Sequence, residues 1–201
     1  MGENGFADRV RRILAARVPI VMRDPSLRPA SVLLPLFAPS NGAPPELWLL
    51  RRADGMRMHG GQVALPGGQP EPEDTSRLAT ALREAHEEIG LVPDEVDVLG
   101  PLDDYATVTG FAVAPYVGWI ASPFRPRPLA SEVARVFAAP LSAFQKPPQA
   151  ISIPWGAGKR IVLSYEAAGE IVWGATAAIL RNFVELVAPE AEALDERERP
   201  D

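Results

Sequence analysis

The amino-acid sequence predicts a fold with both α-helices and β-strands, because two groups of segments with strand composition lie between segments that carry apolar residues at helical spacing. The strand segments are rich in β-branched and aromatic residues and cover residues 30–38, 46–52, 95–105, 110–121 and 159–165. The helical segments are 5–17, 75–89 and 171–187, of which the last begins extended. With 201 residues and 47% hydrophobic composition, the chain is long enough for one domain with a substantial core.

Charge and composition separate this domain from the two ends of the chain. We predict an N-terminal helical extension over residues 1–24, the main domain over 25–188 and an acidic, mobile tail over 189–201. The formal net charge is −6, and the tail holds six acidic residues against two arginines, so four excess charges lie in it. The rest of the chain is nearly balanced, which argues against nucleic acid as a partner.

The remaining composition excludes several classes of site. There is no cysteine, which excludes disulfides and thiolate metal sites, and two histidines are too few for a zinc site of the usual kind. No apolar run approaches membrane-spanning length, and the N-terminus lacks the apolar region of a secretory signal. We therefore predict a cytoplasmic protein with no membrane partner.

The first and last helical segments are predicted to pack on the core. The first carries four apolar residues at helical spacing, Phe6, Val10, Ile13 and Leu14. In the last, the spacing of Ile179, Phe183 and Val187 also favours packing. We interpret Trp173 and Thr176, at its start, as core residues rather than substrate contacts.

Residues 66–91, PGGQPEPEDTSRLATALREAHEEIGL, combine a glycine loop with a short amphipathic helix. Gly67 and Gly68 follow a proline, so the backbone there can approach a ligand closely. The Asp-Thr-Ser run at 74–76 can cap the helix that follows, and Gly90 supplies its stop signal.

Three carboxylates share one face of this helix. An advance of about 100° per residue places Glu84, Glu87 and Glu88 within an arc of roughly 100°. Like charges at this spacing repel one another, so they need either full exposure to water or a compensating partner. A solvated acidic face is the simpler interpretation. A divalent cation such as Mg²⁺ is the functional one, because it prefers oxygen ligands and keeps waters and phosphate oxygens beside a few carboxylates.

The second half of this stretch resembles the Nudix box, G-x5-E-x7-R-E-U-x-E-E-x-G-U, where U is a bulky aliphatic residue. The matching residues are Arg83, Glu84, Ala85, Glu87, Glu88, Gly90 and Leu91. The first half departs from the box, with Thr75 in the place of Glu and Gln69 in the place of Gly, and fits a loop longer by one residue. That variant resembles the coenzyme A diphosphatase subgroup of Nudix hydrolases, to whose pattern Glu71, Asp74 and residues 80–88 correspond.

Segments on both sides of the box strengthen this resemblance. Residues that match the subgroup's upstream signature, LLTxR…LRxHxGQxxFPGG, are Leu49, Leu50, Arg52, Arg57, His59, Gly61, Gln62, Pro66, Gly67 and Gly68. Leu65 replaces the usual Phe, and Arg51 the usual Thr. Downstream, SEVARVFAAPL resembles NEVxEVFxVPL, so Glu132 matches a Glu that approaches the metal cluster, while Ser131 replaces the usual Asn. Residues 171–187 resemble the closing IWGxTAxxL segment.

The resemblance implies an α/β/α sandwich with a mixed β-sheet, in which the box forms a loop-helix-loop catalytic element. The implied cofactor is Mg²⁺ or Mn²⁺. Its implied ligands are Glu84, Glu87, Glu88, Glu132 and the carbonyl of Gly68. The implied substrate-binding residues are Arg52, Arg57, His59 and Gly67. Arginine suits this role because its planar guanidinium group binds phosphate through two hydrogen bonds. Taken alone, His59 would be a structural loop residue and Glu132 a solvated charge.

The implied reaction is metal-dependent hydrolysis of the diphosphate linkage of a small nucleoside diphosphate derivative. Coenzyme A or acyl-CoA is the favoured substrate, giving 3′,5′-ADP and (acyl-)4′-phosphopantetheine. Glu84 or Glu87 would take the proton of the attacking water, while Arg83 and Asp74 would orient these groups. One alternative is a Nudix hydrolase for ADP-ribose, dinucleoside polyphosphates or nucleoside triphosphates. Another is a catalytically silent domain that senses a nucleotide. Whether the chain forms a homodimer is open.

Overall fold

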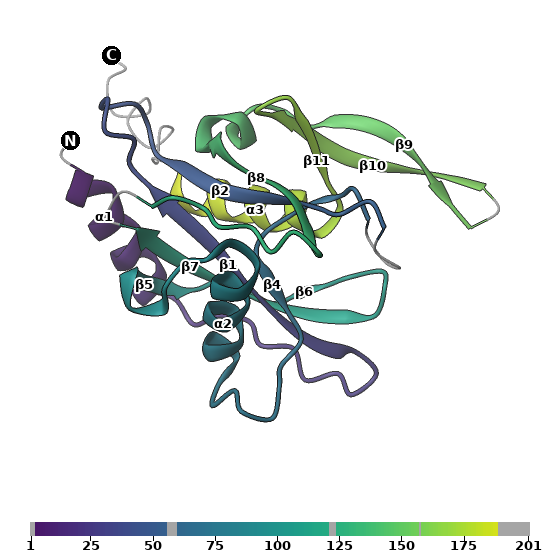
Figure 1. The fold of residues 1–201 in the computed structure, drawn as a ribbon, viewed down its shortest axis with the longest axis horizontal. Helices are drawn as coiled ribbons and strands as arrows, with labels where there is room; N and C mark the ends of the chain where they lie inside the picture. The colour runs from purple at the N-terminus through teal and green to yellow at the C-terminus, as the bar shows by residue number, and fades with distance from the viewer. Residues whose placement is uncertain (1–2, 56–59, 121–123, 157, 189–201) are drawn as a thin grey trace, which may run out of the picture.

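The computed structural model describes residues 3–55, 60–120, 124–156 and 158–188, and folds them into two sheets and three α-helices (Figure 1). The strands of the main sheet are β1 (Arg28–Phe37), β2 (Glu46–Arg52), β3 (Val63–Ala64), β4 (Gly67–Gly68), β5 (Val96–Pro101), β6 (Tyr105–Ala106), β7 (Phe111–Ile120) and β8 (Val133–Pro140). The smaller sheet contains β9 (Gln149–Trp155), β10 (Gly158–Ala167) and β11 (Glu170–Trp173). The helices are α1 (Glu3–Ala15), α2 (Arg77–Ile89) and α3 (Gly174–Val187), with short 3₁₀ turns η1 (Pro93–Glu95) and η2 (Leu141–Gln145). Arg57, His59 and the tail 189–201 lie outside the described residues.

The main sheet is mixed. Its central strands β1 and β7 are parallel, with Arg28 opposite Phe111 at one end and Phe37 opposite Ile120 at the other. The neighbouring strands β2 and β5 pair with them antiparallel, and the order is β3-β2-β1-β7-β5. Three further strands attach to this path, β4 on β1, β6 on β7 and β8 on β2. The mixed sheet expected from the sequence is therefore confirmed.

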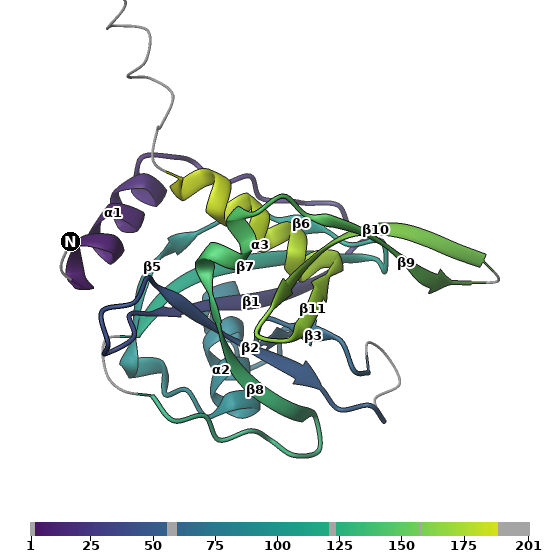
Figure 2. The ribbon, with the colours of Figure 1, turned by 90° about the horizontal axis from the view of Figure 1, so that it is seen from above.

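Helices cover both faces of the main sheet, as the alternation along β1 shows. Leu33 belongs to a core cluster with Ala81, Ala85 and Ile89 of α2. Leu34, the next residue, belongs to the larger cluster, which contains the apolar residues of α1 and α3. Because neighbouring residues of a strand point to opposite faces, α2 lies on one face and α1 and α3 lie on the other (Figure 2). The predicted α/β/α sandwich is confirmed.

The predicted packing of the first helix is also confirmed. Ala7, Val10 and Leu14 of α1 are buried in the larger core. Leu14 lies directly over Gly100 of β5, where an added Cβ would come within 3.0 Å of the leucine Cβ. No helix within the described ranges is long and apolar enough to cross a membrane.

The strand predicted over residues 95–105 is shorter than expected, and β8 and β9 were not predicted. β5 ends at Pro101, because the two aspartates that follow bind the N-terminal segment instead of continuing the strand. The Asp103 carboxylate accepts a hydrogen bond from the Ile20 N–H, and the Asp104 carboxylate accepts one from the Met22 N–H, both at 2.7 Å. The β9–β10 hairpin and the β6–β7 hairpin extend toward the same side of the molecule (Figures 1 and 2).

Candidate active site

The helix that carries the predicted carboxylates is α2, which begins at Arg77 and ends at Ile89. Ser76 is its N-cap, and the Ser76 hydroxyl oxygen accepts a hydrogen bond from the Ala79 N–H at 3.1 Å. Gly90 ends the helix in the left-handed conformation, with φ of 77°. Because both signals are local, the sequence places the helix to within two residues.

The two glycines before the helix form β4 and pair with β1, where Gly67 lies opposite Val32 and Gly68 opposite Ser31. A Cβ added at Gly67 would lie 2.3 Å from the Ser31 carbonyl oxygen and 2.7 Å from the Val32 Cα. A Cβ added at Gly68 would lie 2.3 Å from Oε1 of Glu84. The glycines therefore allow the loop to lie against the strand on one side and the Glu84 carboxylate on the other.

Glu88 is the most deeply buried of the three carboxylates, with 2% of its side chain exposed. Its Oε2 accepts a hydrogen bond from the Gly67 N–H at 2.9 Å, and Nη2 of Arg52 lies 3.2 Å from its Oε1. Burial raises the pKa of Glu88 to about 7, although Arg52 and the Gly67 N–H both lower it. The nearby charges of Glu84 and Glu132 act in the same direction as burial. Glu88 thus fixes α2 to β4 and β2 at a point where negative charge accumulates.

This raised pKa predicts how stability depends on pH in the absence of metal. The ordinary pKa of the carboxyl is 4.5, so Glu88 stabilises the fold when protonated, and that contribution is lost as pH rises through about 7. Relative to Glu88→Gln, the wild-type free energy of unfolding in EDTA should fall by on the order of 3 kcal/mol between pH 4.5 and pH 8. Urea denaturation of both proteins across this range measures the difference. Parallel stability curves would contradict the assigned environment of Glu88.

Glu84 lies one helical turn before Glu88 and has 17% of its side chain exposed. Burial raises the pKa of Glu84, and the charges of Glu87 and Glu132 add to this effect. Arg83 lowers it, with Nη1 at 3.2 Å from Oε1 of Glu84. A carboxylate with a raised pKa and partial access to solvent is suited to accept a proton during a reaction.

Gly68→Ala is expected to lower activity with little loss of stability. The three atoms nearest to the added Cβ all belong to the carboxylate end of the Glu84 side chain, which can rotate away. Because a displacement of about 1 Å can cost about 10²-fold in rate, we expect a loss of that order in kcat. Gly55→Ala is the matched control, since a Cβ there would meet nothing within 4 Å. Turnover assays and thermal melts of both variants check this, and normal kcat in Gly68→Ala would contradict it.

Arg83 joins the loop to the helix. Its Nε lies 3.1 Å from Oδ1 of Asp74, and its Nη2 donates a hydrogen bond to the Gln69 carbonyl at 3.0 Å. The hydrogen bond from Arg83 lowers the pKa of Asp74 to about 2, and Asp74 also accepts from the Thr80 hydroxyl at 2.9 Å. Nη1 of Arg83 lies 2.9 Å from Oε2 of Glu87, whose side chain is 48% exposed. Arg83 therefore holds Asp74 and Glu87 in one network.

A cavity of about 1060 Å³ lies beside this acidic end of α2. The predicted site residues that line it are Arg52, Gly67, Gly68, Glu84, Glu88 and Glu132. Arg83, Asp74 and Glu87 are not among its lining residues; Arg83 pairs with both Asp74 and Glu87 instead. The structure thus brings most of the predicted ligands and substrate contacts to one cavity, whereas the predicted ligand Glu87 and the predicted orienting residues Arg83 and Asp74 lie outside its lining.

The oxygen donors at this end fit a hard divalent cation. Glu84, Glu88 and Glu132 line the same cavity. Besides burial, the charges of Glu87 and Glu132 raise the pKa of Glu84, and those of Glu84 and Glu132 raise the pKa of Glu88. A bound cation would relieve this repulsion. In the described part of the chain, no three acidic or histidine side chains are gathered closely enough to form a metal site alone. Mg²⁺ takes only a few protein carboxylates and completes its shell with waters and substrate phosphate oxygens, so the three glutamates need not form a complete site by themselves.

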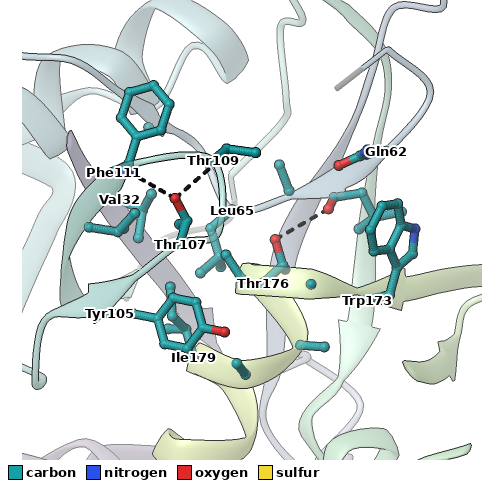
Figure 3. A pocket seen from close by; sticks show the side chains of 18 of the residues that line it. Val32, Gln62, Leu65, Tyr105, Thr107, Thr109, Phe111, Trp173, Thr176 and Ile179 are labelled. Atoms are coloured by element: carbon teal, nitrogen blue, oxygen red, sulfur yellow. Dashed lines mark hydrogen bonds between the residues drawn. The ribbon is translucent and has the colours of Figure 1, made fainter. Parts of the chain in front are cut away.

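The rest of the cavity is lined by residues that the sequence did not identify as a site (Figure 3). They include Tyr105, Thr107, Thr109 and Phe111, which lie on β6, β7 and the turn between them. The interpretation of Trp173 and Thr176 as core residues is wrong, because both are only partly buried and line the cavity. Trp173 ends β11, so the helical spacing that suggested packing applies only from Gly174 onward. The buried positions predicted further along α3 are confirmed, Ile179, Phe183 and Val187.

Comparison with known families identifies this arrangement. The model of the family described as NUDIX domain matches residues 27–148, more than half of the chain. The chain belongs to the Nudix family. As a Nudix hydrolase, it is an enzyme that acts on phosphorus anhydrides in nucleoside diphosphate derivatives.

Relatives and a solved structure agree with this assignment. This Nudix chain is 41% identical over 159 residues to the uncharacterized Nudix hydrolase NudL of Enterobacter sp. (strain 638), covering 78% of this chain and 81% of the relative. It is 40% identical over 168 residues to NudL of Pectobacterium atrosepticum, covering 79% and 85%. A crystal structure of a MutT/nudix family protein from Enterococcus faecalis has a TM-score of 0.52 at 14% identity, covering 93% of this chain and 75% of that protein. This last similarity supports the fold alone.

Proposed function

We propose that this Nudix hydrolase cleaves the diphosphate linkage of coenzyme A or acyl-CoA and releases 3′,5′-ADP and (acyl-)4′-phosphopantetheine. The observation that carries the proposal is the continuity of the cavity. At one end Glu84, Glu88 and Glu132 offer oxygen donors beside Arg52, and the remainder of its volume of about 1060 Å³ is open to a bulky substrate. The resemblance of the upstream and downstream segments to the coenzyme A diphosphatase subgroup supports this choice among Nudix substrates.

In this proposal, Glu84, Glu88, Glu132 and the Gly68 carbonyl hold Mg²⁺ or Mn²⁺. When bound, the cation supplies Lewis-acid polarisation of the phosphoryl oxygens and lowers the pKa of water. Arg52, which already neutralises part of the charge of Glu88, offers its guanidinium group to the diphosphate. The Gly67 N–H keeps the Glu88 carboxylate in place.

We assign the role of general base to Glu84 rather than Glu87. Glu84 lines the cavity and its side chain is partly exposed, so its carboxylate can accept the proton that the attacking water releases. Glu87 is paired with Arg83 and lies outside the cavity lining, so it supports the site through that pair. Arg83 contacts both Asp74 of the loop and Glu84 of α2. We propose that Arg83 and Asp74 position the loop relative to the carboxylates of α2.

A parallel substrate panel tests the proposal. Coenzyme A, an acyl-CoA, ADP-ribose, diadenosine tetraphosphate and a nucleoside triphosphate are incubated with the enzyme and Mg²⁺ or Mn²⁺, and products are identified by mass spectrometry. We expect coenzyme A or acyl-CoA to have the highest kcat/KM, with the two named products, and EDTA to abolish turnover. A higher kcat/KM for one of the other substrates would replace the coenzyme A assignment. Tight binding of a nucleotide without any product would instead favour the catalytically silent sensor.

A further inference from the structure

The cavity is larger than its acidic end requires. Ligand sites for small molecules have volumes of about 300–1,000 Å³, and a cation with a diphosphate occupies only a small part of such a volume. The end away from the carboxylates is formed by three elements: the β6–β7 turn, β10 and α3. The figures show the two hairpins extending to the same side, and residues of the β6–β7 turn and of β10 line this outer part of the cavity (Figures 1 and 2).

Aliphatic side chains line this outer part and are unusually exposed. Val108, in the β6–β7 turn, is 63% exposed, and Ile161 and Leu163 of β10 are 67% and 48% exposed. All three line the cavity. Ile161 and Leu163 are two positions apart on a strand, so they point to the same face of β10. Large aliphatic side chains that face a cavity gain free energy when a ligand removes them from water.

We propose that Val108, Ile161 and Leu163, here called the aliphatic wall, bind the acyl chain of a coenzyme A thioester. This inference rests on the proposed function and makes acyl-CoA, rather than free coenzyme A, the preferred substrate. A nucleobase is usually bound by stacking on aromatic rings, and the cavity offers Tyr105 and Trp173 for that purpose (Figure 3). The aliphatic wall carries no ring, and its flexible apolar surface suits a flexible apolar chain.

The size of the preference follows from the burial of methylene groups. Each methylene that is fully buried contributes about 0.8 kcal/mol, which corresponds to about fourfold in kcat/KM. The aliphatic wall is open to solvent, so burial of an eight-carbon chain is partial. We expect octanoyl-CoA to exceed free coenzyme A in kcat/KM by at least about tenfold in the wild type.

The test compares variants of the aliphatic wall with a matched control on the same sheet. In the double variant Ile161→Thr/Leu163→Thr, threonine keeps a high strand preference while it removes apolar surface. The control is Ile171→Thr, because Ile171 lies on β11, is 47% exposed and does not line the cavity. Val108→Thr, on the opposite hairpin, provides a second variant that leaves β10 unchanged. Thermal melts establish that each protein is folded.

The measured quantity is the ratio of kcat/KM for octanoyl-CoA to kcat/KM for free coenzyme A. We expect the double variant to lower this ratio at least tenfold, Val108→Thr to lower it to a smaller extent, and Ile171→Thr to keep the wild-type ratio. A ratio near one in the wild type, or a wild-type ratio in the variants, would overturn the acyl-chain inference while the coenzyme A assignment stands. Absence of turnover on every coenzyme A substrate by the wild type would remove the proposed function, and the inference with it.

Discussion

Glu84→Gln is expected to lower kcat by about 10²–10⁴-fold while the protein stays folded. The substitution keeps the size of the side chain but removes both the proton acceptor and one negative charge from the cavity. Burial raises the pKa of Glu84, so its ionised form costs stability in the folded state. The neutral amide should therefore leave the melting temperature at pH 8 unchanged or higher.

Steady-state assays with Mg²⁺ and with Mn²⁺, together with thermal melts, measure both effects of this substitution. Glu95→Gln is the control, because Glu95 is exposed and lies after α2, outside the cavity lining. It should retain wild-type kcat. Near-normal turnover by Glu84→Gln would remove Glu84 from the catalytic centre. An unfolded variant would contradict the expectation that its charge is unfavourable to the fold.

Gly67→Ala is expected to have the largest effect on stability. The added Cβ would meet backbone atoms of β1, the Ser31 carbonyl oxygen at 2.3 Å and the Val32 Cα at 2.7 Å, and neither can rotate away. The strand and loop must separate, which also withdraws the Gly67 N–H from the buried Glu88 carboxylate. Strain of this kind, combined with a lost hydrogen bond to a buried charge, costs about 3 kcal/mol.

For a chain of this length, such a loss corresponds to a decrease of roughly 6–12 °C in melting temperature. Chemical denaturation and thermal melts of Gly67→Ala, Gly68→Ala and Gly55→Ala in parallel test it, because the three substitutions are chemically identical. Only the first is expected to be strongly destabilised, and only the second should combine a normal melting temperature with low activity. Equal stability of all three would mean that β4 does not approach β1 as closely as described.

The local parts of the site could be predicted from the sequence. Helical spacing, a capping serine and a terminal glycine determine α2, and each acts within a few residues, so its bounds were nearly correct. The spacing also placed three glutamates on one side of the helix. It did not distinguish between them, because their surroundings come from elsewhere in the chain. Arg52, 36 residues before Glu88, and Gly67, 21 residues before it, are what make Glu88 different from Glu87.

The outer cavity could not be predicted from the sequence for a similar reason. Its wall combines the β6–β7 turn with β10 and α3, which are far apart in the chain and meet only when the smaller sheet packs beside the main one. Trp173 shows the difficulty, since its position fits an apolar helical stripe but lies one residue before the helix begins. The resemblance of residues 171–187 to the closing IWGxTAxxL segment pointed to a functional role for Trp173 and Thr176, whereas the apolar spacing of this segment favoured packing on the core.

The proposed metal site can be tested by a titration with Mn²⁺ at pH 8, followed by electron paramagnetic resonance of the free ion. We propose that the carboxylates of the cavity gather a divalent cation whose shell a diphosphate completes. Wild-type protein should bind Mn²⁺ saturably, and more tightly when methylene diphosphonate is added, whereas Glu84→Gln should bind it at least tenfold more weakly. Equal Mn²⁺ affinity in the two proteins, with no effect of the diphosphonate, would contradict the claim.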